Sequence, residues 1–280
     1  MTLLSELPET GETLQPQAAD TTVPRRSLPV WVISAITVVG ILGAWQIAAL
    51  ASLLPPLFLP SPLVVVKSLY SLVVNGFVDS TLAQHTLASL GRVSAALVVS
   101  VAIGIPVGLA IATSRVGRGV LDPIVEFLRP LPPLAYLPLI IIWIGIGEAS
   151  KVTVIALSML PSIIIATAAG VRATPEDYIN AARSVGASRK QVLLNVILPS
   201  ALPSILTGTR IALGTGWSTL VAAELVAASR GLGFMIQSAA QFLVTDVVIA
   251  GIFVIATIAI LLEVLARWLE RWIAPWANKQ

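Results

Sequence analysis

One stretch of this chain carries no charge from Val152 to Val171 and is bracketed by Lys151 and Arg172. A helix needs about 20 apolar residues to cross the hydrocarbon core of a bilayer. No water is available in that core, so each backbone amide and carbonyl must be paired within the protein, which a helix achieves within one segment. The stretch therefore predicts a transmembrane helix and restricts the chain to folds that suit a membrane.

Similar uncharged runs recur, and together they predict an all-α membrane protein with six transmembrane helices. Hydrophobic residues make up 56% of the 280, and charged residues make up 11%, about half of the share in a soluble domain. A large soluble core can be equally apolar, but it does not produce repeated uncharged runs of bilayer length. The spans are expected at 28–53, 87–113, 123–146, 152–171, 201–228 and 247–269.

The domain organisation follows from these runs. We expect a transmembrane domain over 28–275, a disordered cytoplasmic tail over the polar residues 1–27 and a short tail over 276–280. Loops rich in Lys and Arg stay in the cytoplasm. With the N-terminus inside, eleven Lys and Arg residues outside the spans fall on the cytoplasmic side and three on the outer side. Both termini are therefore expected to be cytoplasmic.

Prolines and glycines predict local features of the bundle. Pro130 and Pro133 lie in the third span, where each proline removes a helix donor, so we expect an interfacial helix followed by a break. The stretch 62–74 is apolar but too short to cross, so it should lie on the surface or pack on the bundle. Gly104 and Gly108 have the spacing of a close contact between two helices.

The residue inventory excludes several kinds of site. The chain has no cysteine and a single histidine, His85, which is expected in a polar loop before the second span. Thiolate sites, disulfides and histidine clusters are excluded, and no metal site or catalytic residue is expected. The sequence has no Gly-x-x-x-x-Gly-Lys-Ser/Thr phosphate loop, so the chain is not an ATPase. Its scattered basic residues, without interleaved aromatics, do not indicate a nucleic-acid partner.

Three other classes of membrane protein fit the sequence less well. A secondary transporter usually has repeated halves and acids or histidines near the midplane, whereas the acids here lie near the ends of the predicted spans. An intramembrane hydrolase would need a serine with a histidine, or two buried aspartates. A scaffold protein would not need breaks in its spans.

The longest predicted cytoplasmic loop, 172–200, has the pattern of two short helices. Thr174 is a candidate N-cap of the first helix, followed by a proline and two acidic residues. Gly186 can end that helix in a left-handed conformation. Ser188, with a glutamine three residues on, has the capping-box pattern that starts a second helix, and Leu198-Pro199 is expected to stop it.

This loop also carries a spaced pattern, which comprises Asn180, Ala181, Ala182, Gly186, Val196, Leu198 and Pro199. The spacing resembles the Glu-Ala-Ala…Gly…Ile-x-Leu-Pro loop of the permeases of ABC importers. Asn180 replaces the family's glutamate, which puts in doubt any salt bridge made there, and Val196 replaces its isoleucine. The resemblance implies that the loop is a coupling helix seated in a groove of an ATPase subunit. The alternative is that small residues merely let two helices pack.

Other segments resemble one branch of this family, the sulfonate, taurine and nitrate permeases. They lie at 129–138, 143–148 and 214–225, and Arg230–Met235 follows as in that branch. Within it, Gly216–Leu220 and the stretch 245–248 are most similar to the permeases of taurine transport.

The resemblance implies a type I importer fold and a set of partners. Two copies of the permease would form the path in a bacterial inner membrane, and two ATPase subunits would hold ATP and Mg²⁺, so this chain would need no cofactor. A periplasmic binding protein would deliver taurine or a related sulfonate. Another anion, such as an alkanesulfonate or nitrate, remains an alternative substrate.

Five residues in or near the breaks are candidates for the substrate path. Arg210 could contact a sulfonate, or it could pair with a neighbouring helix. Glu224 could help to gate the outer mouth or contact the binding protein, or it could be a solvated carboxylate at a helix end. Trp217 could line the path, or it could face lipid or a neighbouring helix. Pro133 and Pro138 could break a path-lining helix or simply kink it.

Overall fold

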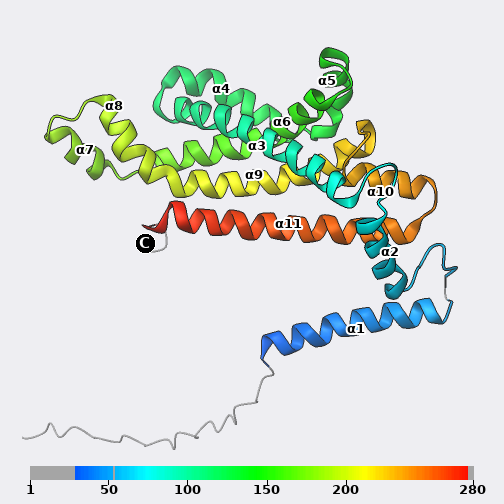
Figure 1. Ribbon diagram of the computed structural model, residues 1–280. Helices are drawn as coiled ribbons and strands as arrows, with labels where there is room; N and C mark the ends of the chain where they lie inside the picture. The colour runs from blue at the N-terminus through cyan, green and yellow to red at the C-terminus, as the bar shows by residue number, and fades with distance from the viewer. Residues whose placement is uncertain (1–28, 53, 277–280) are drawn as a thin grey trace, which may run out of the picture. The chain divides into compact units, whose positions relative to one another are not determined.

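The computed structural model describes residues 29–52 and 54–276 (Figure 1). The chain forms two compact units, Met1–Ala44 and Trp45–Gln280. Helix α1 (Val30–Leu50) begins in the first unit and carries no charge along its length, which agrees with the predicted first span. The tail predicted at 1–27, and that at 276–280 apart from Trp276, lie outside the described residues.

All the secondary-structure elements described in the second unit are helices. Its long apolar helices follow the predicted spans, and short helices connect them. They are α2 (Pro62–Val74), α3 (Leu82–Thr113), α4 (Arg115–Leu128), the 3₁₀ turn η1 (Pro133–Tyr136), α5 (Leu137–Ile144), α6 (Glu148–Arg172), α7 (Glu176–Ser184), α8 (Arg189–Val192), the π turn η2 (Leu193–Ile197), α9 (Leu198–Ala227), α10 (Leu232–Gln241) and α11 (Thr245–Ile273).

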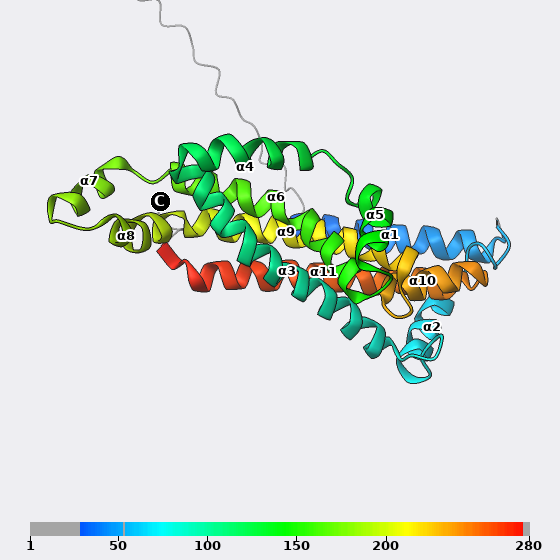
Figure 2. The ribbon, with the colours of Figure 1, turned by 90° about the horizontal axis from the view of Figure 1, so that it is seen from above.

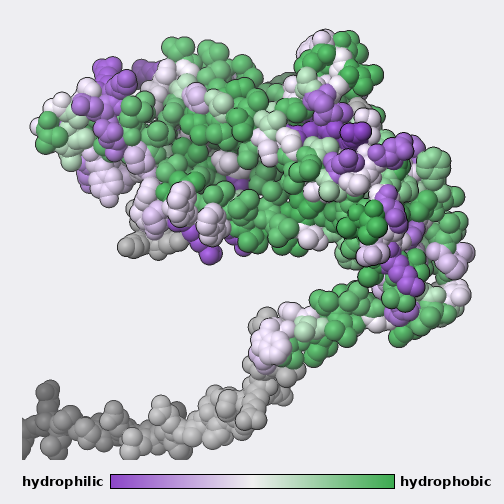
Figure 3. Space-filling model, in the orientation of Figure 1, coloured by the Kyte–Doolittle hydropathy of each residue, from purple (hydrophilic) through white to green (hydrophobic). Residues whose placement is uncertain are grey.

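Helix α6 forms the centre of this unit and packs between α3 and α9, while α11 lies along α9 (Figures 1 and 2). Helices α7 and α8 project from one end, together with the C-terminal end of α11. Helix α10 and the first turns of α3 and α6 lie at the opposite end. Polar residues gather near these two ends, and apolar residues cover the helices between them (Figure 3). This distribution matches a bilayer around the middle of the helices.

Among the described residues, five helices are long and apolar enough to cross a membrane, or six if a bent pair forms one span. The bent pair joins Arg115–Leu128 to Pro133–Ile144 at an angle of 97°. The predicted break is therefore confirmed, but the helix before it begins at Arg115 and not at residue 123. Ser114 explains the early start, since its hydroxyl accepts the amide of Gly117 and caps α4 immediately after α3 ends.

The short helix predicted at 62–74 is confirmed as α2, and it packs on the bundle. Val65 and Leu72 are buried in the main core. The hydroxyl of Ser68 donates to the carboxylate of Asp246 at the start of α11. Apolar packing and one polar contact thus fix α2 against α11.

Gly104 and Gly108 form the predicted close contact, which brings α3 against α6. A Cβ added at Gly108 would lie 2.7 Å from the carbonyl oxygen of Ile164, and one added at Gly104 would lie 2.8 Å from Cγ2 of Ile163. The absence of side chains at these two positions lets the backbones approach closely.

We expect Gly108→Ala to destabilise the protein although alanine is the better helix former. The added methyl group meets backbone that cannot move aside, and such overpacking costs about 1–3 kcal/mol. Gly91→Ala in the same helix is the matched control, because no atom of the described residues lies within 4 Å of its added Cβ. Thermal melting in detergent, followed by size exclusion, compares the two. Equal melting temperatures would contradict the close contact.

Candidate functional site

The α7–α8 segment has the predicted turn between two helices. Gly186 has a φ of +83°, in the left-handed region that glycine tolerates. Its amide donates to the carbonyl of Arg183 at 2.9 Å. The Ser188 capping box is also confirmed: the Ser188 amide donates to Oε1 of Gln191 at 2.8 Å, and the Gln191 amide donates to Oγ of Ser188 at 3.4 Å.

Two predictions for this segment are wrong. Thr174 does not cap α7, since Pro175 holds the N-cap position and the Thr174 hydroxyl is directed back to the carbonyl of Gly170. Leu198-Pro199 does not stop the second helix, because α8 continues through η2 into α9. In the π turn, the Leu198 amide reaches back to the carbonyl of Leu193. This wider turn accommodates the proline ring, which would otherwise clash with the preceding turn of an α-helix.

The surface of this segment is open and partly apolar. Val185, at the tip of the turn, is 84% exposed, and Tyr178 and Leu194 are also exposed. Asn180 and Ala181 are exposed, while Ala182 is half-buried. A hollow of about 280 Å³ runs beside the turn and is lined by Ala182, Val185, Gly186, Ala187, Gln191, Asn195 and Val196. Exposed apolar side chains beside a hollow suit a protein partner.

Four charged side chains, which we call the charged network, lie at the opposite end of the unit, where α3, α6 and α9 meet. Arg92 of α3 is 5% exposed, and its Nη1 donates to Oε1 of Glu224 at 2.6 Å. Its other edge forms a bidentate pair with Glu148, from Nε at 2.6 Å and from Nη2 at 2.8 Å. Lys151 donates to the same Glu148 at 2.9 Å. Two buried cations and two carboxylates thus join three helices.

Glu224 is fully enclosed by hydrogen-bond donors. Oγ of Ser89 lies 2.8 and 3.0 Å from its two carboxylate oxygens, and the Gly233 amide donates to it at 2.9 Å. Its side chain has no exposed surface. The alternative of a solvated carboxylate at the helix end is therefore wrong, and the side chain presents no surface to a partner here. A buried carboxylate needs such donors to remain charged.

His85 was expected in a loop, but it lies inside α3 and is fully buried. Its Nδ1 accepts the Gly231 amide at 3.1 Å, so Nε2 carries the proton and donates to the carbonyl of Phe77 at 3.0 Å. Gly231 has a φ of +134°, and a Cβ there would lie 2.4 Å from the carboxyl carbon of Glu224. His85 and Gly231 together hold the α9–α10 turn over the charged network.

The helix α3 begins at Leu82 because Thr81 forms a capping box with Gln84 there. This capping pair is the local sequence signal for the earlier start and for the placement of His85 within the helix.

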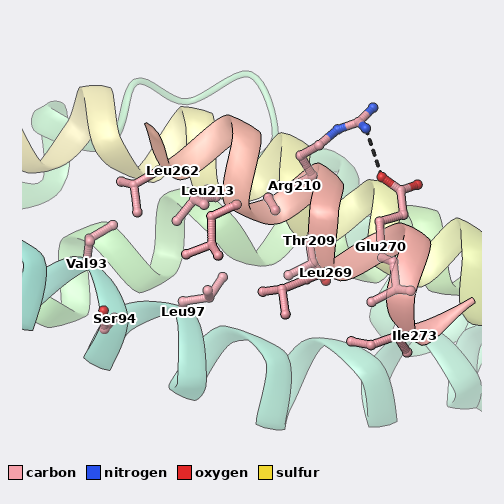
Figure 4. A pocket seen from close by; sticks show the side chains of 13 residues that line it. Val93, Ser94, Leu97, Thr209, Arg210, Leu213, Leu262, Leu269, Glu270 and Ile273 are labelled. Carbon is pink, nitrogen blue, oxygen red and sulfur yellow. Dashed lines mark hydrogen bonds and ion pairs between the residues drawn. The ribbon is translucent and has the colours of Figure 1, made fainter. Parts of the chain in front are cut away.

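Arg210 lies in a separate hollow (Figure 4). It pairs with a neighbouring helix, which is the second of the two alternatives given for it. Its Nη1 donates to Glu270 at 2.8 Å, and Glu263 lies 3.7 Å from its Nε. Glu263 also pairs with Arg267 at 3.4 Å, as their spacing of four residues on α11 permits. The hollow measures about 250 Å³, and apolar side chains from α3, α9 and α11 form most of its wall.

The other candidate path residues do not line this hollow. Trp217 of α9 is 6% exposed and packs in the main core, so it does not face open space, and its indole Nε1–H meets no acceptor among the described residues. Pro133 begins the 3₁₀ turn and is half-buried, whereas Pro138 is exposed in the first turn of α5. The described residues contain no group of three or more His, Asp or Glu side chains suited to a metal ion.

Sequence reasoning did not identify Arg92 and Lys151 as members of the site. Their positions in the sequence predict charges at the ends of spans, with Lys151 on the outer side, yet Lys151 is 3% exposed within α6. A signal did exist: both cations lie beside long apolar runs, where a charge needs a partner.

The comparisons with known proteins agree with this architecture. Residues 104–275 match the family model described as "Binding-protein-dependent transport system inner membrane component". The chain is 55% identical over 241 residues to the taurine transport system permease protein of Escherichia coli strain K12. The aligned residues make up 86% of this chain and 88% of the relative. It is 39% identical to the putative aliphatic sulfonates transport permease protein of the same strain, over 85% of this chain and 89% of the relative.

Solved structures show the same fold. The inward-facing MetNI methionine ABC transporter matches with a TM-score of 0.61 and 22% identity, over 69% of this chain and 95% of that chain. An amino acid ABC transporter with histidines matches with a TM-score of 0.58 and 19% identity, over 76% of this chain and 97% of that chain. The fold is that of type I ABC importer permeases. The chain therefore belongs to the family of binding-protein-dependent transport system inner membrane components: it is a multi-pass permease subunit of an ABC importer, and this subunit is not the one that hydrolyses ATP.

Proposed function

We propose that this permease subunit carries taurine or a related sulfonate across the bacterial inner membrane. The observation that supports this substrate most strongly is the 55% identity to the E. coli taurine permease over most of both chains. The lower identity to the aliphatic sulfonate permease favours taurine over other sulfonates. A permease for bicarbonate in Synechococcus elongatus is 36% identical, so another small anion is the second candidate.

The proposed assembly contains two copies of this chain, two ATPase subunits and a periplasmic binding protein. ATP and Mg²⁺ would be held by the ATPase subunits. Residues 174–199 would dock on the ATPase, since the exposed Val185 and the hollow beside Gly186 lie at the end from which α7 and α8 project. Both termini and this loop would be cytoplasmic, in keeping with the distribution of Lys and Arg. The buried charged network would then lie near the outer face.

ATP turnover by the reconstituted complex tests the substrate. The chain is co-purified with its candidate ATPase in lipid nanodiscs, and the binding protein is added with and without taurine. We expect turnover to rise severalfold with the taurine-loaded binding protein. Alkanesulfonate, nitrate and bicarbonate are tested in parallel. A response to one of these alone would assign the other anion, and failure to associate with any ATPase would contradict the importer assembly.

A further inference from the structure

Two buried cations in the charged network share one exposed carboxylate. The side chains of Arg92 and Lys151 are 5% and 4% exposed, whereas that of Glu148 is 62% exposed. Glu148 accepts from Nε and Nη2 of Arg92 and from Nζ of Lys151. The carboxylate therefore covers the edge of the guanidinium that would otherwise face water. That edge, with its two parallel N–H groups, is the fork that binds carboxylates and other oxyanions.

The two glutamates of the network differ in how easily they can leave. Glu224 is sealed among Ser89, Arg92 and the Gly233 amide, so its release would strand a charge in the interior. The carboxylate of Glu148 is already largely hydrated, so it regains water readily on moving out, and the cost of its release falls on the two buried cations that lose their partner.

Departure of Glu148 would leave a positively charged pocket. Arg92 would keep Glu224 and the carbonyl of Arg230 on its Nη1, while its outer edge and Lys151 would lack a partner. The N-terminus of α6, where Glu148 is the first residue, adds further positive potential. An oxyanion with three acceptor oxygens can satisfy all three free donors.

We propose that Arg92 and Lys151 form a binding site for the sulfonate group of the substrate, which Glu148 occupies as an internal stand-in when substrate is absent. This inference rests on the proposed function and names the residues that would receive the substrate near the outer face. A sulfonate is ionised at all physiological pH values and offers the three oxygens that the site requires. Its arrival releases Glu148 and loosens the link between α3 and α6.

The surroundings of Arg210 provide a contrast within the same chain. There, Arg210 lies 2.8 Å from Glu270 and 3.7 Å from Glu263, so an arginine again faces two glutamates. Both arginines near Glu263 are partly exposed, at 29% and 51%. Glu263 thus bridges two cations as Glu148 does, but its removal leaves no buried cation without a partner.

Binding of radiolabelled taurine to the permease–ATPase complex in nanodiscs, without the binding protein, tests the proposal. Removing the competing carboxylate with Glu148→Gln is expected to lower the apparent Kd about tenfold, because the site is no longer occupied by its own glutamate. Lys151→Met is expected to raise the Kd about tenfold through loss of one donor cation. Glu263→Gln, the matched control, should stay within about twofold, as an exposed pair contributes little.

Unchanged affinity in both Glu148→Gln and Lys151→Met would overturn the proposal, as would the absence of taurine binding in every variant. A purely structural ion pair would not bind taurine more tightly when broken. Lys151→Met keeps the Arg92–Glu148 pair, so it remains informative if Glu148→Gln does not fold. Turnover of the wild-type complex with taurine-loaded binding protein is measured in parallel. If taurine stimulates the wild type but the variants bind alike, the site assignment alone fails; if taurine does not stimulate it, the substrate assignment fails.

Discussion

The Arg92→Met protein is expected to melt roughly 10 °C below the wild type and to lose transport, since removing one partner of a buried ion pair costs about 3–5 kcal/mol. The cost arises from Glu224, whose side chain has no exposed surface. Without Arg92 it keeps hydrogen bonds from Ser89 and the Gly233 amide but has no cation beside it. Thermal melting of the purified protein in detergent measures the effect.

Two further variants separate this cause from general damage. Arg92→Met combined with Glu224→Gln should recover much of the lost stability, because no uncompensated charge then remains in the interior. Arg210→Met removes an arginine that is 29% exposed, so its melting temperature should change little. An Arg92→Met variant, without the second substitution, that is as stable as the wild type would show that Glu224 needs no cation.

Gly186→Pro is expected to abolish coupled transport while leaving the helical bundle folded. Proline holds φ near −65°, whereas Gly186 has a φ of +83°, and proline also lacks the amide that donates to Arg183. Forcing the turn into another shape costs about 3 kcal/mol, which corresponds to roughly a hundredfold loss of the docking-competent form. Co-purification with the ATPase and taurine-stimulated ATP turnover measure this loss.

Gly186→Asn is the matched control for this substitution. Asparagine tolerates the left-handed region, and in the part of the chain that the structure describes nothing lies within 4 Å of a Cβ at this position. The asparagine variant should therefore bind the ATPase nearly as well as the wild type. Because the turn is exposed and distant from the core, neither variant should shift the melting temperature of the bundle. Normal coupling in Gly186→Pro would show that the α7–α8 turn does not carry the signal.

Features that depend on local rules could be predicted from the sequence alone. Bilayer thickness and backbone pairing set the long helices, so the run Val152–Val171 predicted α6 directly. The break in the third span, the left-handed Gly186 and the Ser188 capping box were predictable because each depends on a residue and its near neighbours. The Leu198-Pro199 prediction failed because a proline signal does not show whether a π turn will absorb it.

The pairing of the charges could not be predicted, because it depends on how the helices pack. Arg92 lies 56 residues from Glu148 and 132 residues from Glu224, and no spacing rule connects positions so far apart. A charge beside an apolar run indicates that a partner is needed, but not which one. The packing of α3 against α6 and of α6 against α9 brings these three side chains together and leaves Glu148 exposed while burying Glu224. Burial and pairing depend on that long-range arrangement, because the free energy of a charge depends on the whole of its surroundings.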